Sequence, residues 1–219
     1  WPENWSERPQ LLRVDQTHAY FADGSSAEID AIILCTGYLH SFPFMSESLR
    51  LKTDNILYPL HLYQGVVWEA NPQLFYLGMQ DQWYSFNMFD AQAWYARDVM
   101  LGKIALPSFA EMQADTQAWH EEEKTLQDAA AMFKFQGDYI MRLIDQTDYP
   151  SFDIEAVRLT FLQWKKHKQE NIMAFRDNTY RSLMTGTMAT PHHTPWIDAL
   201  DDSLEAYLQT EANLQQKAG

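Results

Sequence analysis

The residues whose types could support chemistry gather in one stretch, residues 78–90, which reads GMQDQWYSFNMFD. Amides, a carboxylate, a hydroxyl and aromatic rings lie in it, between the expected end of a strand and the expected start of a helix. The first turn of a helix carries unpaired backbone N–H groups and a partial positive charge. Such a stretch can hold a planar ligand on which negative charge develops. Packed core rings and a plain helix cap at Asn87 would leave the same pattern.

A second candidate is the pair Thr36-Gly37, which follows the apolar run AIILC at residues 31–35. A glycine after a buried strand lets the backbone approach a flat ligand closely and donate its N–H groups. A glycine that only turns the chain is an equally good interpretation.

A third candidate is a basic island, WKKHK at residues 164–168, in an otherwise acidic chain. Its Lys side chains, together with Arg176, could bind a phosphate group. If one helix ran through this region, Trp164 and Arg176 would lie about 18 Å apart along its axis. They would then contact opposite ends of an extended ligand, or the island would be a solvated helix face.

Several catalytic and metal-binding motifs are absent from the sequence. There is no G-x-S-x-G elbow, no C-x-x-C pair, no P-loop and no G-x-G-x-x-G. The run HEEEK at residues 120–124 misses the zinc pattern H-E-x-x-H, because Lys124 replaces the second histidine. We therefore interpret this run as a solvated helix face and expect no metal site.

Strands and helices must position these candidates. Residues 18–23 and 28–35 predict two strands joined by a turn at Asp23-Gly24, and residues 31–35 are apolar throughout, as in a strand covered on both faces of an α/β sheet. Another short strand is expected at residues 74–77, and ligands of such sheets bind at the carboxyl ends of strands. The predicted helices are residues 85–101 with Gly102 after the last turn, 108–135, 139–145, a long helix from Ser151 or Asp153 to about Gly186, and 195–217.

Composition and charge exclude several classes of protein. The 219 residues are 46% hydrophobic, which can fill a core, and the net charge of −14 argues against nucleic acid and anionic membranes as partners. The longest apolar run is far shorter than the roughly 20 residues that cross a bilayer. The single cysteine, Cys35, excludes an internal disulfide. We predict a soluble, cytoplasmic protein.

Two stretches taken together, LCTGY at residues 34–38 and FYLGMQDQWYSFNMFDAQA at residues 75–93, resemble the flavin-containing monooxygenase family. The bacterial trimethylamine monooxygenase branch is the best match. The stretches QGDY, DYPSFD and HHTPWID, at residues 136–139, 148–153 and 192–198, are similar to that branch too. The resemblance therefore covers nearly the whole chain.

The resemblance implies an α/β fold, namely the C-terminal part of a flavoprotein with two dinucleotide-binding domains, one for FAD and one for NADPH, and a mostly helical C-terminal region. Residues 1–106 would end the dinucleotide-binding region, including the C-terminal part of the FAD domain, and residues 107–219 would form the helical region that packs on those domains. In this family NADPH reduces FAD, and the flavin captures O2 as a C4a-hydroperoxide. An oxygen atom then passes to a small tertiary amine, which for trimethylamine gives the N-oxide.

Positions carried over from the family assign the FAD contacts. Gln82 and Ser85 would lie beside the isoalloxazine ring, and Thr36 and Gly37 would be backbone neighbours of the cofactor.

The same carry-over assigns the second cofactor and the substrate. Asp81 and Trp83 would border the substrate or nicotinamide pocket, and Trp164 and Arg176 would contact NADP. No catalytic residue is assigned within the chain.

The chain departs from the family because both glycine loops, for FAD and for NADPH, and the signature between them are missing. They would precede residue 1, and residues 1–5 (WPENW) contain neither an initiator Met nor a signal peptide. We therefore expect the chain to require the missing N-terminal half of the same enzyme, to be inactive alone, and to act in a homodimer.

Two other functions stay open. One is a non-catalytic helical module that binds a protein partner. The other is a related flavin monooxygenase that oxygenates sulfides or ketones and differs only in the shape of its pocket.

Overall fold

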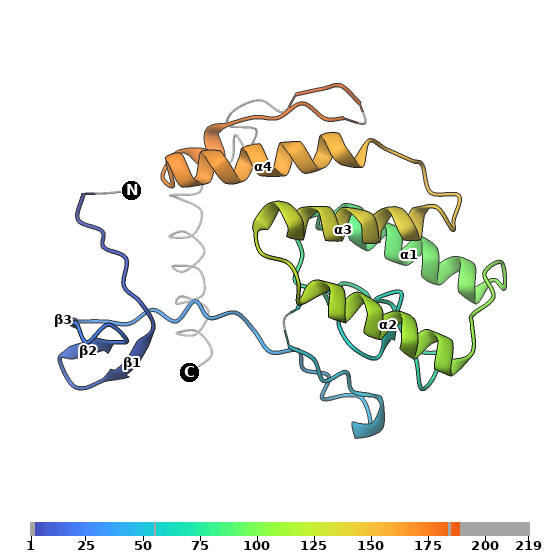
Figure 1. Cartoon of the computed structure of the whole chain (residues 1–219), viewed down its shortest axis with the longest axis horizontal. Coiled ribbons are helices and arrows are strands. Elements are labelled where there is room, and N and C mark those ends of the chain that lie inside the picture. Colours follow the sequence, from blue (N-terminus) through green and yellow to red (C-terminus); the bar gives the residue numbers. More distant parts are fainter. Residues whose placement is uncertain (1–2, 55, 184, 189–219) are drawn as a thin grey trace, which may run out of the picture. The chain divides into compact units, whose positions relative to one another are not determined.

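Short antiparallel strands open the chain (Figure 1): β1 (Leu11–Val14), β2 (His18–Phe21) and β3 (Ser26–Glu28). The turn predicted between β2 and β3 is confirmed. Gly24 adopts a φ of +81°, and the Asp23 carboxylate accepts hydrogen bonds from the backbone N–H and the hydroxyl of Ser25, at 2.9 and 2.6 Å. This glycine supplies the positive φ that a tight hairpin turn needs.

The structure, a computed structural model, describes residues 3–54, 56–183 and 185–188. The chain divides into two compact units, residues 1–150 and 151–219. The helix predicted at residues 195–217 and the HHTPWID stretch lie outside the described residues. The expected division after residue 106 concerns the domains of a larger flavoprotein and stays a prediction.

The buried strand predicted at residues 31–35 is wrong. These residues belong to no strand, and the side chains of Ile33 and Leu34 are 87% and 78% exposed. An apolar central strand forms only where neighbouring strands pair its backbone and cover its faces. In the part of the chain that the structure describes, every strand pairing is antiparallel and none includes this segment. The strand predicted at residues 74–77 is likewise reduced to a single bridge between Phe75 and Val67.

The remainder of the first unit combines irregular segments with a short hairpin and helices. The elements are η1 (Glu47–Leu49), the hairpin of β4 (Leu62–Tyr63) and β5 (Val67–Trp68), α1 (Phe86–Met100), α2 (Phe109–Glu123) and α3 (Ala129–Ile144). Helix α1 packs against α3, and α2 contacts β4. Large fully buried side chains, most of them aromatic, fill the core between these elements: Tyr58, Leu62, Tyr84, Met88, Tyr95, Phe133 and Tyr139.

The helix boundaries follow capping residues. Helix α1 agrees with the predicted residues 85–101, and Gly102 follows it at a φ of +70°. The helix predicted at residues 108–135 is divided after Glu123, because Asp128 caps a second helix by accepting the N–H of Ala131 at 2.8 Å. The predicted helix at residues 139–145 is the end of α3.

The second unit contains α4 (Ile154–Glu170) and the short η2 (Phe175–Asp177). The predicted start is confirmed, because the Asp153 carboxylate accepts the N–H of Ala156 at 3.0 Å. The predicted end near Gly186 is wrong. Helix α4 stops at Glu170, and the side chain of Asn171 accepts the N–H groups of Met173 and Ala174, both at 3.1 Å, which turns the chain. No helix among the described residues is long and apolar enough to cross a membrane.

Candidate functional site

The polar stretch found in the sequence forms a loop, residues 78–85, that leads into α1; we call it the 78–85 loop. It begins at Gly78, whose φ is +71° and whose N–H donates to Oε1 of Gln92 at 2.8 Å. A Cβ atom at this position would lie 2.7 Å from the ring of Phe89. Only glycine therefore satisfies both the backbone conformation and the space at the start of the loop.

A buried hydrogen-bond network underlies the first half of the loop. Tyr139 on α3 donates its hydroxyl to the backbone oxygen of Gln64 at 2.9 Å and accepts from Nε2 of Gln92 at 2.8 Å and of Gln80 at 3.3 Å. Nε2 of Gln92 also lies 2.9 Å from Oε1 of Gln80. Burial raises the pKa of the Tyr139 hydroxyl well above its usual range. The hydroxyl therefore acts as a neutral donor and acceptor.

A second glutamine of α3, Gln136, holds the middle of the loop. Its Oε1 accepts the N–H of Trp83 at 2.9 Å, and its Nε2 donates to the backbone oxygen of Asp81. The ring of Trp83 packs edge-on against Phe133, with centroids 5.0 Å apart. Tyr84 donates its hydroxyl to the backbone oxygen of Phe133 at 2.9 Å. Helix α3 thus fixes the loop at successive residues.

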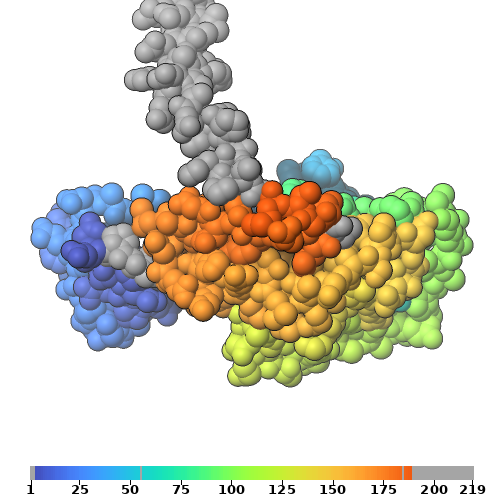
Figure 2. Space-filling view, turned by 90° about the horizontal axis from the view of Figure 1, so that it is seen from above, coloured from blue at the N-terminus to red at the C-terminus, as the bar shows by residue number. Residues whose placement is uncertain are grey.

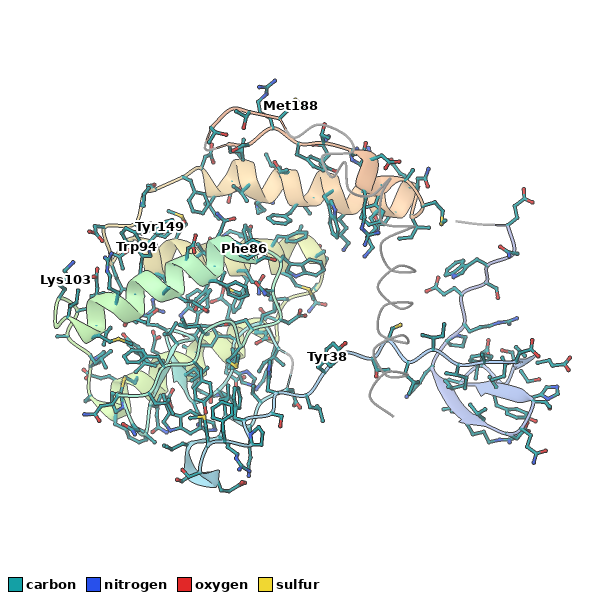
Figure 3. The ribbon with its side chains drawn as sticks, turned by 180° about the vertical axis from the view of Figure 1, so that it is seen from behind. Tyr38, Phe86, Trp94, Lys103, Tyr149 and Met188 are labelled. Carbon is teal, nitrogen blue, oxygen red and sulfur yellow. The ribbon has the colours of Figure 1, made fainter. Side chains whose placement is uncertain are left out.

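The loop ends in an unusual backbone conformation at Ser85, the N-cap of α1. Its φ of +41° and ψ of −108° are rare for a residue with a side chain, and conformations of this kind cost about 1–3 kcal/mol. The Ser85 side chain makes no capping hydrogen bond and is exposed. The hydroxyl is therefore accessible to a ligand, and the exposed ring of Phe86 follows it at the start of α1 (Figure 3).

Two buried polar atoms of the loop have no partner among the described residues. They are Oε1 of Gln82, an acceptor, and Nε1 of Trp83, a donor. Leaving such a group unpaired costs about 1–3 kcal/mol, so a ligand that pairs them would gain affinity. The edge of an isoalloxazine ring offers both N–H and C=O groups. The side chain of Asp81 is exposed on the same loop.

The other predicted FAD neighbours, Thr36 and Gly37, lie in the exposed stretch that follows residues 31–35. Gly37 has a φ of +82°, and a Cβ atom there would meet nothing within 4 Å. No hydrogen bond joins either residue to Gln82 or Ser85 in the described part of the chain. The structure therefore does not bring these two groups of predicted residues together.

The predicted NADP residues, by contrast, are brought together within the second unit. The ring of buried Phe175 lies edge-on to Trp164, with centroids 5.7 Å apart, and 4.4 Å from the guanidinium of Arg176. The ammonium of Lys168 lies 5.4 Å from the ring of Trp164. The idea that Trp164 and Arg176 occupy opposite ends of one helix is wrong, because the chain turns back after Glu170. In Figure 2 the orange atoms of α4 and the red-orange atoms after it form one continuous surface.

The helix face at residues 120–124 is less solvated than expected. The side chain of Glu123 is 16% exposed, and its carboxylate accepts the N–H groups of Leu57 at 2.7 Å and Tyr58 at 3.0 Å. Glu123 therefore ties α2 to the segment before β4.

Sequence reasoning named Asp81, Gln82, Trp83 and Ser85 of the loop and missed the buried residues that hold it: Gln80, Gln92, Gln136 and Tyr139. Glutamine is mostly a surface residue, so its type gives no sign of burial. Two of the resembling stretches contain these residues: residues 75–93 include Gln80 and Gln92, and QGDY includes Gln136 and Tyr139.

Comparisons with known proteins point to one family. A family model described as flavin-binding monooxygenase-like matches residues 5–161. The chain is 57% identical over 209 residues to a trimethylamine monooxygenase of Roseovarius sp. (strain 217), covering 95% of the chain and 47% of that relative. It is 53% identical over 207 residues to a trimethylamine monooxygenase of Methylocella silvestris, covering 94% of the chain and 46% of the relative.

Solved structures give the same result for the fold. The crystal structure of Tmm from Pelagibacter sp. strain HTCC7211 matches with a TM-score of 0.82 and 48% identity, over 94% of this chain and 47% of that one. An S-allyl-L-cysteine S-oxygenase from Allium sativum matches with a TM-score of 0.60 and 24% identity, over 74% of this chain and 38% of that one, which shows a shared fold alone. The predicted α/β flavoprotein fold is confirmed, and the chain spans about half the length of the relatives it matches.

Proposed function

Because this chain belongs to the flavin-binding monooxygenase-like family, we propose that it forms part of an NADPH- and O2-dependent enzyme that N-oxygenates small tertiary amines. Trimethylamine is the expected substrate, since relatives at 57% and 53% identity carry the name trimethylamine monooxygenase. The rest of the enzyme would be an N-terminal half that contributes the remaining cofactor contacts. We expect the whole enzyme to form a homodimer.

The unpartnered buried atoms Gln82 Oε1 and Trp83 Nε1 are the observation that carries the proposal. They fit a flavin, whose ring edge presents both a donor and acceptors. Gln82 and the exposed Ser85 would contact the ring system beside α1, whose first turn favours negative charge on a reduced ring. Thr36 and Gly37 would contact the same cofactor through their backbone.

A bound flavin with NADPH would supply the electrons and the activation of O2 that oxygen transfer to an amine nitrogen requires. The chain itself would position the amine, supply charge near it and exclude water from the reacting centre. The rings of Trp83 and Phe86 would cover the reacting centre, and aromatic faces attract a small ammonium ion by about 0.5–2 kcal/mol each. The Asp81 carboxylate would add a favourable charge for the cationic form of the substrate.

In this proposal the second unit binds NADP. The Arg176 guanidinium can form paired hydrogen bonds with a phosphate, and the ring of Trp164 can contact a flat base or ribose. Phe175, buried between them, fixes both side chains. Lys168 adds a positive charge in an otherwise acidic protein.

The test, made on the intact enzyme with its N-terminal half, is an absorption spectrum from about 350 to 500 nm together with an assay of trimethylamine N-oxide in the presence of NADPH and O2. Bound flavin with N-oxide formation supports the proposal. An enzyme that binds flavin but oxygenates only dimethyl sulfide or a ketone would show that the substrate is a sulfide or a ketone and not an amine. A protein that stays colourless after addition of FAD would identify a binding module instead.

A further inference from the structure

One buried side chain fixes the backbone on both sides of Gln82. Gln136 is 1% exposed, and its amide bonds to the N–H of Trp83 and to the carbonyl of Asp81. These two backbone groups flank Gln82, which itself makes no hydrogen bond to Gln136. The orientation of Gln82 is therefore set by a residue of α3, more than fifty positions away in the sequence.

Few side chains could replace Gln136. The two bonds require one acceptor and one donor on the same flat group, and an amide supplies both. A glutamate of the same length only accepts, so it could keep the bond to the Trp83 N–H and would repel the Asp81 carbonyl. A methionine of similar volume would lose both bonds.

We call the two hydrogen bonds from Gln136 to the loop the clamp. Holding the loop in this way carries a free-energy cost. With the loop held, Gln82 Oε1 and Trp83 Nε1 stay buried without a partner among the described residues. A loose loop could rotate and pair both atoms with water or backbone, which is favourable for unpaired groups. Holding them unpaired is useful only where a bound molecule completes the pairs, because groups fixed in advance cost nothing to organise during a reaction.

We propose that Gln136 is a positioning residue, which acts through Gln82 and Trp83 to set the alignment of the flavin ring and the amine. The inference rests on the proposed monooxygenase function. It predicts that loss of the clamp misaligns oxygen transfer and leaves NADPH binding unchanged, because the predicted NADP residues Trp164 and Arg176 lie in the second unit.

The experiment compares Gln136→Met and Gln136→Glu in the intact enzyme, with Asp128→Ala as the matched control. Asp128 caps the same helix through the N–H of Ala131 and has no hydrogen bond to the 78–85 loop, so its loss destabilises α3 alone. We expect Gln136→Met to raise the KM for the amine about tenfold, as for the loss of a buried hydrogen bond. A larger share of the NADPH consumed should then yield hydrogen peroxide instead of N-oxide. The KM for NADPH should stay unchanged. Gln136→Glu should show a smaller effect on both readouts.

If Asp128→Ala changes the amine KM and the peroxide share as much as Gln136→Met does, Gln136 only stabilises the helix and the inference fails. Failure of the proposed function is visible separately, in a wild-type enzyme that binds FAD and forms no N-oxide. The visible band of bound flavin then decides the inference. A shift in Gln136→Met but not in Asp128→Ala supports the clamp, and no shift overturns it.

Discussion

The hydroxyl of Tyr139 on α3 lies 2.8 Å from Nε2 of Gln92 on α1, so the two helices meet in one buried polar network. The same hydroxyl reaches the backbone oxygen of Gln64 and the side chain of Gln80. A single oxygen atom therefore connects α3 to α1, to the turn after β4 and to the 78–85 loop.

Replacing this hydroxyl should destabilise the first unit. Tyr139→Phe keeps the ring and leaves the Gln64 carbonyl and two amide donors without their partner. Each buried group left unpaired costs about 1–3 kcal/mol, so we expect a loss in the free energy of unfolding at least that large. Urea unfolding followed by circular dichroism measures it. Tyr20→Phe, which removes an exposed hydroxyl bond to Asp15, is the control and should change stability little. Equal losses in the two variants would contradict the central role of Tyr139.

Gly78 should tolerate no side chain. Gly78→Ala places a methyl group 2.7 Å from the Phe89 ring at a φ of +71°, so strain and overpacking add. Overpacking alone costs about 1–3 kcal/mol. Gly102→Ala shares the positive φ, at +70°, and meets nothing within 4 Å. Thermal unfolding should separate the two, with Gly78→Ala the less stable protein; the same melting temperature for both would exclude the contact with Phe89 as the cause.

The carboxylate of Asp98 should make the free energy of unfolding depend on pH in the acidic range. Hydrogen bonds from the Arg97 guanidinium, at 2.7 and 2.9 Å, hold the pKa of Asp98 below its usual range. The folded state therefore binds fewer protons than the unfolded state, in which the pKa is about 3.9. The stabilisation is present above that pH and is lost as the pH falls through the folded pKa.

Asp98→Asn tests this dependence. It should lower stability at neutral pH and flatten the loss of stability below about pH 4, measured by urea unfolding across a pH series. Asp138→Asn removes a surface carboxylate that pairs with Lys134 at 2.5 Å and serves as the control, because exposed pairs contribute little. A pH profile of Asp98→Asn parallel to that of the wild type would rule out Asp98 as the source.

Arg176→Ala should weaken NADPH binding in the intact enzyme. If its guanidinium pairs with a phosphate, the KM for NADPH should rise about tenfold and the amine KM should stay constant. Lys124→Ala is the control, since Lys124 is exposed, pairs with Glu121 at 2.8 Å and belongs to the first unit. An unchanged KM for NADPH in Arg176→Ala would remove Arg176 from the cofactor site.

The sequence was most informative where local rules decide the structure. Helix α1 was predicted to within one residue at each end, because Gly102 marks its C-terminus, and of the two starts expected for α4, Ser151 or Asp153, the second is the cap. The strand at residues 31–35 was predicted wrongly, because strand formation depends on neighbouring strands as well as on composition.

The site could be predicted in part for the same reason. The pattern of polar and aromatic residues before a helix drew attention to the loop, and Gln82, Trp83 and Ser85 were then named as predicted site residues by the family resemblance. The residues that orient them were not, because Gln136 meets Trp83 across fifty-three positions of sequence and no spacing rule connects the two. Long-range pairs of this kind appear only when the helices have packed.

The exposed stretch at residues 31–35 has a practical consequence for anyone who prepares this chain. A run of five exposed apolar residues that pairs with no strand in the described part of the chain is a ready template for edge-to-edge pairing between molecules. Prepared by itself, the chain should form oligomers and precipitates whose growth rises with concentration. A charge placed in the middle of the run, as in Ile33→Lys, should delay this aggregation.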